Sequence, residues 1–378
     1  MPQRSLVVVL ALLIALLFSG RVHADTPRVS FLRVPDHGIQ PQVVIDSAST
    51  LHLVYFSGDP RHGDLYYVHT SLTDDSGFSS PIRVNKREGA ATALDAIRGA
   101  QIAVGRGGRV YVAWNGSVSA PRASTGTPMY FTRLNSAGTR FENERNIITW
   151  AGGIDGGGTL ACDNQGSVYV AWHGGGEPEG GVYLAKSTDD GATFSREVQI
   201  SKPGLGQCGC CAMKALVNAA GDLLILYRTA ERSINRDTAL LRSHDGGATF
   251  ESAIVHPWYD DTCPLTGYAL ADGLSTTLGA WETEDQVYFT TDIVGRSAPM
   301  IAAPGKGYRK YPAVAQAANG STLFVWVEPS EAEIGKLGWQ VYDKDGIPES
   351  ESGLIVGVPR YSFPQLYVSP SGGFVILY

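Results

Sequence analysis

The chain has 378 residues, of which 45 are glycine, 20 are proline and five are cysteine, and its formal net charge at pH 7 is −7. A negative net charge, with the charged residues scattered along the chain, argues against a nucleic-acid-binding protein. Glycines and prolines separate short apolar runs and no long helical pattern is present, so we expect an all-β fold.

The first 24 residues have the features of a secretory signal. Arg4 supplies a positive start, the apolar run from Leu6 to Phe18 follows, and a polar segment ends at Ala24. We expect cleavage after Ala24. The alternative, an uncleaved membrane anchor, is disfavoured because the apolar run is too short to span a bilayer comfortably. The mature chain, residues 25–378, would then be secreted or periplasmic, carry a net charge of −9 and have no membrane span.

A single pattern recurs along residues 41 to 378: a short apolar strand, a polar turn and a second apolar strand that ends in an aromatic residue. The closing aromatics lie 45 to 59 residues apart, and they are Tyr55, Trp114, Trp172, Tyr227, Trp281, Trp326 and Tyr378. Two further strands follow within each period, for example Val182 to Lys186 and Val198 to Ile200. Four strands in each period of about 50 residues are typical of a β-propeller blade.

We therefore expect residues 25–378 to form a single β-propeller domain. The pattern occurs seven times, and the last copy has only two strands because the sequence ends at Tyr378. A seventh, incomplete blade is the prediction, and the segment from Arg28 to Val34 can add a strand to it and close the ring. A propeller of six blades stays open as an alternative.

The phrase S-x-D-x-G-x-T-F occurs twice, each time between the third and fourth strands of a blade. Its defining residues are Ser187, Asp189, Gly191 and Phe194 in one copy and Ser243, Asp245, Gly247 and Phe250 in the other. An aspartate can accept backbone N–H bonds inside a turn, and glycine permits a positive φ. We interpret the phrase as a structural hairpin turn rather than a catalytic motif. Degenerate copies stand at residues 71–78 and 134–141.

This phrase resembles the Asp box, or BNR repeat, of the sialidase superfamily, and the resemblance covers the chain from about residue 28 to its end. It implies an exported bacterial propeller, usually six-bladed, that acts on or binds glycans. A sialidase holds its substrate carboxylate with arginines and uses a tyrosine nucleophile activated by a glutamate, with an aspartate as acid/base. The resemblance assigns Arg33 to the early arginine, Tyr361 to the nucleophile, Glu282 to its partner and Asp59 to the acid/base. The alternatives are that Arg33 merely belongs to an edge strand and that Tyr361 merely precedes the last blade.

The residue after each closing aromatic is polar or charged in four consecutive blades. These residues are Asn115, His173, Arg228 and Glu282, and their common register predicts that they point toward one rim of the propeller. The crossings between blades add Arg98, Asp155, Arg309, Lys310 and Arg360 around the mouth of the central channel. Such a rim could seat an anionic sugar. The alternative is a set of ordinary solvated loop starts.

Four cysteines lie in two neighbouring crossings. Cys208, Cys210 and Cys211 precede blade four, and Cys263 precedes blade five, so the four thiols can meet. A bond between the adjacent Cys210 and Cys211 would be strained, so we expect Cys263 to pair with one of the other three. A soft-metal site aided by His256, or a redox pair, are the alternatives. Cys162 is expected to be a buried free thiol.

Three functional hypotheses follow. The first is a glycan-acting propeller, of exo-sialidase or related glycosidase type. The second is a non-catalytic propeller that binds a ligand or a protein through the same rim, and the third is a propeller whose cysteines bind metal or cycle redox state. We expect a glycan or another small anionic ligand, no cofactor, no nucleic-acid partner and a monomeric protein.

Overall fold

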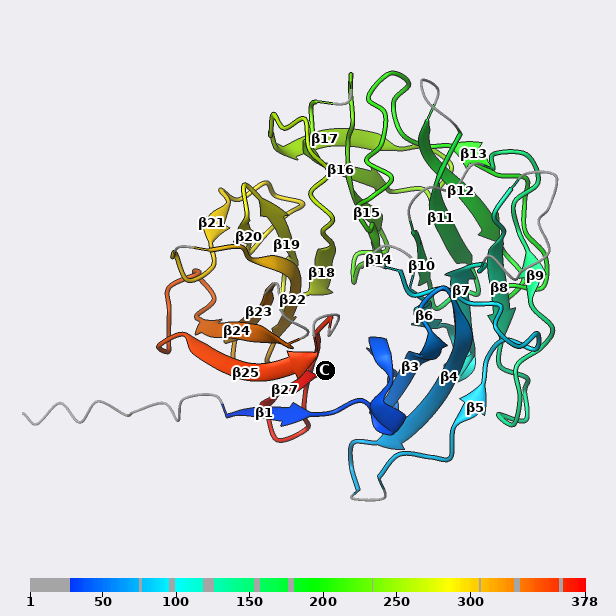
Figure 1. Ribbon diagram of the computed structural model, residues 1–378, viewed down its shortest axis with the longest axis horizontal. Coiled ribbons are helices and arrows are strands. Elements are labelled where there is room, and N and C mark those ends of the chain that lie inside the picture. Colours follow the sequence, from blue (N-terminus) through cyan, green and yellow to red (C-terminus); the bar gives the residue numbers. More distant parts are fainter. Residues whose placement is uncertain are drawn as a thin grey trace, which may run out of the picture.

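The computed structural model describes residues 28–74, 77–94, 99–117, 126–152, 157–175, 180–232, 234–305, 307–329, 334–359 and 363–378. The predicted signal at residues 1–24 therefore lies outside the described part of the chain. Seven sheets are arranged in a ring (Figure 1), six of them four-stranded and one three-stranded. This confirms the prediction of seven blades with an incomplete last one. A search of the described residues finds no helix with the length and apolar character of a membrane span.

The first three blades have their strands in chain order from the channel outward. Blade one contains β2 (Ile39–Ile45), β3 (Thr50–Asp59), β4 (His62–Ser71) and β5 (Ile82–Arg83). Blade two contains β6 (Gln101–Val104), β7 (Val110–Asn115), β8 (Met129–Arg133) and β9 (Arg145–Asn146). Blade three contains β10 (Gly158–Cys162), β11 (Val168–Gly174), β12 (Gly181–Ser187) and β13 (Val198–Gln199). Two short 3-10 helices, η1 (Pro35–His37) and η2 (Arg106–Gly108), stand in the connections.

The remaining blades repeat this order. Blade four contains β14 (Lys214–Val217), β15 (Leu223–Arg228), β16 (Thr238–Ser243) and β17 (Glu251–His256). Blade five contains β18 (Tyr268–Asp272), β19 (Thr277–Thr283), β20 (Gln286–Thr290) and β21 (Met300–Ile301). Blade six contains β22 (Lys310–Gln316), β23 (Thr322–Glu328), β24 (Ile334–Tyr342) and β25 (Gly353–Pro359). Blade seven contains β26 (Gln365–Val368), β27 (Phe374–Leu377) and β1 (Val29–Leu32).

The N-terminal strand closes the ring, as the sequence predicted. Strand β1 pairs in parallel with β27, so that Val29 lies opposite Phe374 and Leu32 opposite Leu377. The Val34 N–H donates to the Tyr378 carbonyl at 2.9 Å, and the Tyr378 N–H donates to the Leu32 carbonyl at 3.0 Å. Figure 1 shows β1, in blue, beside the last strands, in red. The two ends of the described chain therefore stabilise one another through the last blade.

Seven hydrophobic clusters hold the blades together, and each cluster fills the space between two neighbouring sheets. The closing aromatics of the first six blades are at most 1% exposed. They lie in second strands, which have a neighbouring blade on both sides. Burial of an aromatic side chain of this size is worth several kcal/mol at about 25 cal/mol per Å², which explains why an aromatic recurs at this position.

The two S-x-D-x-G-x-T-F phrases form hairpin turns with equivalent hydrogen bonds. Asp189 accepts the Thr193 N–H at 2.8 Å and its hydroxyl at 2.7 Å. Asp245 makes the same two contacts with Thr249 at 2.9 and 2.6 Å. In the first copy Gly191 has a φ of 72°, which a residue with a Cβ adopts only with strain. The predicted positions between the third and fourth strands are confirmed, because the phrases join β12 to β13 and β16 to β17.

Candidate functional site

A cavity of about 450 Å³ occupies the central channel. Its wall contains the second residue of the repeated pattern from six of the seven blades: Gln42, Gln101, Lys214, Tyr268, Ala313 and Gln365. Four of these residues open the innermost strands β6, β14, β18 and β26. Because the chain enters every innermost strand from a blade crossing, these side chains lie toward the crossing face of the channel. We call this set the channel ring.

The channel ring is polar and carries one positive charge. Three of its members are side-chain amides, which both donate and accept hydrogen bonds. Lys214 is half-buried, and within the described residues it makes no ion pair. Burial lowers the pKa of its ammonium, because a charged group loses hydration inside the channel. An anionic group bound beside Lys214 would provide an ion-pair partner for the ammonium.

Arg228 and Glu282 form a buried pair between the second strands of blades four and five. The Arg228 guanidinium donates to the Arg236 carbonyl at 2.7 Å and to the Glu282 carbonyl, and its Nη2 lies 3.9 Å from Glu282 Oε2. It stacks 4.7 Å from the Trp258 ring centre. Both side chains are fully buried. Burial raises the pKa of the Glu282 carboxyl to about 7, although the Arg228 charge opposes the shift. The pair is therefore an internal contact between blades four and five.

Asn115 and His173 are also buried, at 2% and 0% exposure. Each of these residues still belongs to a second strand, because β7 ends at Asn115 and β11 ends at Gly174. A second strand has a blade on each of its sides, so its polar residues face protein rather than an open rim. Burial lowers the pKa of His173 to about 3, so the imidazole is neutral at pH 7. The shared register predicted from sequence is present, but it places these side chains inside the protein.

The other sequence-predicted residues lie apart from one another. Asp59 is exposed at the hairpin between β3 and β4, where it accepts the Arg61 N–H at 2.8 Å. Arg33 is exposed above the Tyr378 ring, at 5.9 Å. Arg309 is buried against Trp326 and lies 3.6 Å from Glu328. Of the predicted residues in the described part of the chain, Arg228 and Glu282 are brought into contact. Four predicted residues lie outside the described part of the chain: Arg98, Asp155, Arg360 and Tyr361.

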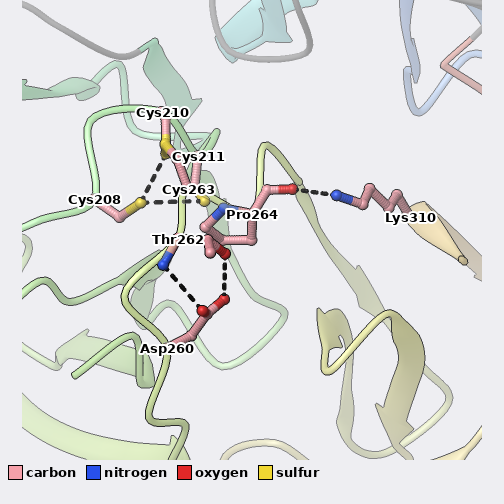
Figure 2. The surroundings of a disulfide bond; sticks show 8 residues. All are labelled: Cys208, Cys210, Cys211, Asp260, Thr262, Cys263, Pro264 and Lys310. Atoms are coloured by element: carbon pink, nitrogen blue, oxygen red, sulfur yellow. Dashed lines mark hydrogen bonds between the residues drawn. A yellow bond between two sulfur atoms is a disulfide. The ribbon is translucent and has the colours of Figure 1, made fainter. Parts of the chain in front are cut away.

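The four cysteines lie close together where the crossings that precede blades four and five meet (Figure 2). Cys210 and Cys263 form a disulfide, with their Cα atoms 6.4 Å apart, which confirms the prediction that Cys263 pairs with one of the other three. The Cys208 sulfur lies 3.0 Å from Cys210 Sγ and 3.5 Å from Cys211 Sγ. Cys162 is a free, half-buried thiol in β10, and burial raises its pKa to about 12.

No family model and no curated protein matches this sequence. Solved structures with a similar fold include the Trypanosoma rangeli sialidase in complex with the inhibitor DANA, with a TM-score of 0.52 and 12% identity over 80% of this chain. They also include the Hadza microbial sialidase Hz136, with a TM-score of 0.49 and 13% identity over 82% of this chain and 69% of that one. The chain spans about half (54%) of the length of the T. rangeli enzyme. The similarity to that enzyme establishes the class of fold, a β-propeller of the kind found in sialidases.

The channel ring escaped prediction although its signal is present in the repeat. The second residue of the copies is Gln42, Gln101, Thr159, Lys214, Tyr268, Ala313 and Gln365, and six of these seven are polar or bear a hydroxyl. An innermost strand that packed only against protein would favour apolar residues at this position. The recurrence of polar residues at the second position of the repeat was therefore the sequence feature that could have predicted a solvated channel.

Proposed function

We propose that this chain is an exported glycan-binding propeller of the sialidase superfamily that seats an acidic sugar at the channel ring. The observation that carries the proposal is Lys214, a half-buried ammonium without an ion-pair partner among the described residues, in the wall of a 450 Å³ cavity. Cavities of about 300–1,000 Å³ are typical of small-molecule sites. Export is supported by the predicted signal and by the Cys210–Cys263 bond, since disulfides persist in oxidising compartments.

The side chains of the ring suit a polyhydroxylated ligand. Sugar hydroxyls donate and accept hydrogen bonds, and so do the amides of Gln42, Gln101 and Gln365. Tyr311 and Tyr367, which line the same cavity and are half-buried, combine an apolar ring with a polar hydroxyl. Lys214 is the group that would distinguish an acidic sugar from a neutral one.

Binding is favoured over hydrolysis because the expected catalytic groups do not share an open site. Glu282 is enclosed with Arg228, whose guanidinium is occupied by carbonyl groups, while Asp59 is exposed on a hairpin of blade one. An exo-sialidase needs arginines that are free to grip a carboxylate. Turnover of a fluorogenic sialoside by the purified protein would replace the binding proposal by a hydrolytic one.

Titration calorimetry with N-acetylneuraminic acid, glucuronic acid and galactose tests the proposal. We expect binding of at least one acidic sugar, and Lys214→Met should weaken it by about 10- to 100-fold, the equivalent of about 1.5–3 kcal/mol for a hydrogen bond to a charged group. Lys344→Met is the matched control, because Lys344 is an exposed lysine paired with Asp345. Equal affinity in the wild type and Lys214→Met, or no binding of either acid, would refute the proposal.

A further inference from the structure

The cysteine cluster has the geometry of a reactive centre and is independent of the proposed sugar site. Cys208 Sγ lies 3.0 Å from one sulfur of the Cys210–Cys263 disulfide and 3.5 Å from Cys211 Sγ. Reacting atoms about 3–3.5 Å apart are at the distance of a near-attack arrangement. A thiol, a disulfide and a second thiol are thus in contact in one cluster, as Figure 2 shows.

Backbone hydrogen bonds hold this arrangement together. The Cys208 N–H donates to the Arg228 carbonyl at 2.8 Å, and the Cys211 N–H donates to the Cys208 carbonyl at 3.1 Å, which closes a tight turn. The Ala212 N–H then donates to the Thr266 carbonyl at 2.9 Å. This last bond joins the turn to the crossing that carries Cys263. The sulfur atoms therefore stay close together whichever pair of them is bonded.

The four sulfurs form a path from the surface to the interior. Cys263 is exposed and Cys210 is half-buried, whereas Cys208 and Cys211 are 1% and 0% exposed. A hydrogen bond from the Cys211 thiol, helped by the charges of Arg236 and Arg228, lowers the pKa of the Cys208 thiol to about 7. Burial raises the pKa of Cys211. Cys208 is thus suited to attack as a thiolate, and Cys211 to remain a thiol until a second step.

We propose that the cluster is a thiol–disulfide exchange site, in which Cys208 attacks the Cys210–Cys263 bond and Cys211 resolves the product. In the first step the Cys208 thiolate forms a bond to Cys210 Sγ, and the electron pair of the broken bond leaves on Cys263, which takes a proton from solvent. In the second step Cys211 loses its proton and attacks Cys208, and Cys210 leaves as a thiolate. One disulfide and two thiols are present before and after, so the exchange needs no external oxidant or reductant.

The exchange moves the disulfide to the buried Cys208–Cys211 pair and leaves Cys210 and Cys263 as a dithiol. Because Cys263 is exposed, this dithiol can react with a disulfide on an external molecule, whereas the starting form offers no thiol at the surface of the cluster. The external partner is defined by chemistry as a protein or small-molecule disulfide. The channel ring takes no part in this reaction.

Disulfide mapping of the full-length protein tests the proposal. The protein and its variants are equilibrated anaerobically at pH 8 without added reductant or oxidant, quenched with N-ethylmaleimide and mapped by peptide mass spectrometry. We expect the wild type to divide between the Cys210–Cys263 and Cys208–Cys211 bonds. Cys211→Ser should accumulate the Cys208–Cys210 bond with a labelled Cys263, and Cys208→Ser should retain Cys210–Cys263 alone. Cys162→Ser is the matched control, because Cys162 is a free thiol outside the cluster.

A second measurement covers the case in which Cys211→Ser fails to fold. Iodoacetamide labelling of Cys263 in the folded wild type should proceed at least 10-fold faster than in Cys208→Ser, and its rate should rise most steeply near pH 7. Equal labelling in the two proteins, or a Cys210–Cys263 bond that never exchanges, would overturn the proposal. It would also be overturned by a purified protein that holds one equivalent of a soft metal on four reduced cysteines, since thiolates also select such ions.

Discussion

Replacement of Glu282 by glutamine tests whether burial or the Arg228 charge dominates the pKa of the Glu282 carboxyl group. Glutamine has nearly the same shape as protonated glutamate and can still accept the Asp285 N–H, which donates to Glu282 Oε1 at 2.8 Å. The substitution therefore removes the ability to ionise while it keeps the packing. Any effect that depends on pH then reports the cost of placing a negative charge at this position.

The magnitude follows from the pKa of the group. In the folded protein the pKa is raised to about 7 from an ordinary value of 4.5. Since the folded value is the higher one, the contribution of Glu282 to stability is complete below about pH 4.5 and is lost as the pH rises through 7. At 1.36 kcal/mol per pKa unit, the loss is about 3 kcal/mol. Glu282→Gln should match the wild type at pH 4.5 and exceed it by about 3 kcal/mol at pH 8.

Urea unfolding followed by tryptophan fluorescence measures this difference at pH 4.5, 6, 7 and 8, provided that the slopes with denaturant agree between the proteins. The exposed Glu351→Gln is the control, and it should change stability by less than about 0.5 kcal/mol. A Glu282→Gln protein that is less stable than the wild type at pH 8 would refute the reasoning. It would mean that an ionised pair with Arg228, at 3.9 Å, stabilises the fold more than burial of the charge costs.

Two more predictions concern single side chains. Asp189→Ala should lower stability by about 1 kcal/mol, the net value of a typical hydrogen bond, because the exposed turn loses its contacts with Thr193. Sugar binding should be unchanged in calorimetry, and a large loss of affinity would contradict the assignment of this turn to the face opposite the crossings. His173→Leu should reduce the acid sensitivity of the protein: the wild type, with a pKa lowered to about 3, should lose about 2 kcal/mol more than the variant between pH 7.5 and 5, as the unfolded histidine is protonated below pH 6.5. Equal losses in urea unfolding at the two pH values would show that the buried imidazole does not control this dependence.

The sequence determined the blades and the turns between their outer strands, and it favoured seven blades while six stayed open. These features depend on local patterns: short apolar strands, glycine and aspartate in the turns, and an aromatic residue that ends each second strand. The same local logic correctly assigned the segment after Arg28 to the last blade, because that blade lacked strands and an unpaired sheet edge favours the addition of another.

Only the tertiary structure decided which polar residues face solvent and which face protein. In an isolated sheet, a polar residue after Trp172 or Tyr227 would be expected at a solvated strand end, but in a propeller the neighbouring blades cover both sides of the second strands, so His173 and Arg228 are buried. Local sequence patterns were equally unable to predict contacts between residues that are far apart in the sequence. Arg228 contacts Glu282, which is 54 residues away in the sequence, and Cys263 forms its disulfide with Cys210, which is 53 residues away. Both contacts form because the radial arrangement of the blades brings neighbouring blades and their crossings together. The channel ring depends on both the sequence pattern and the tertiary structure. Its residues recur at one position of the repeat, but they line one cavity only because the seven blades close into a ring.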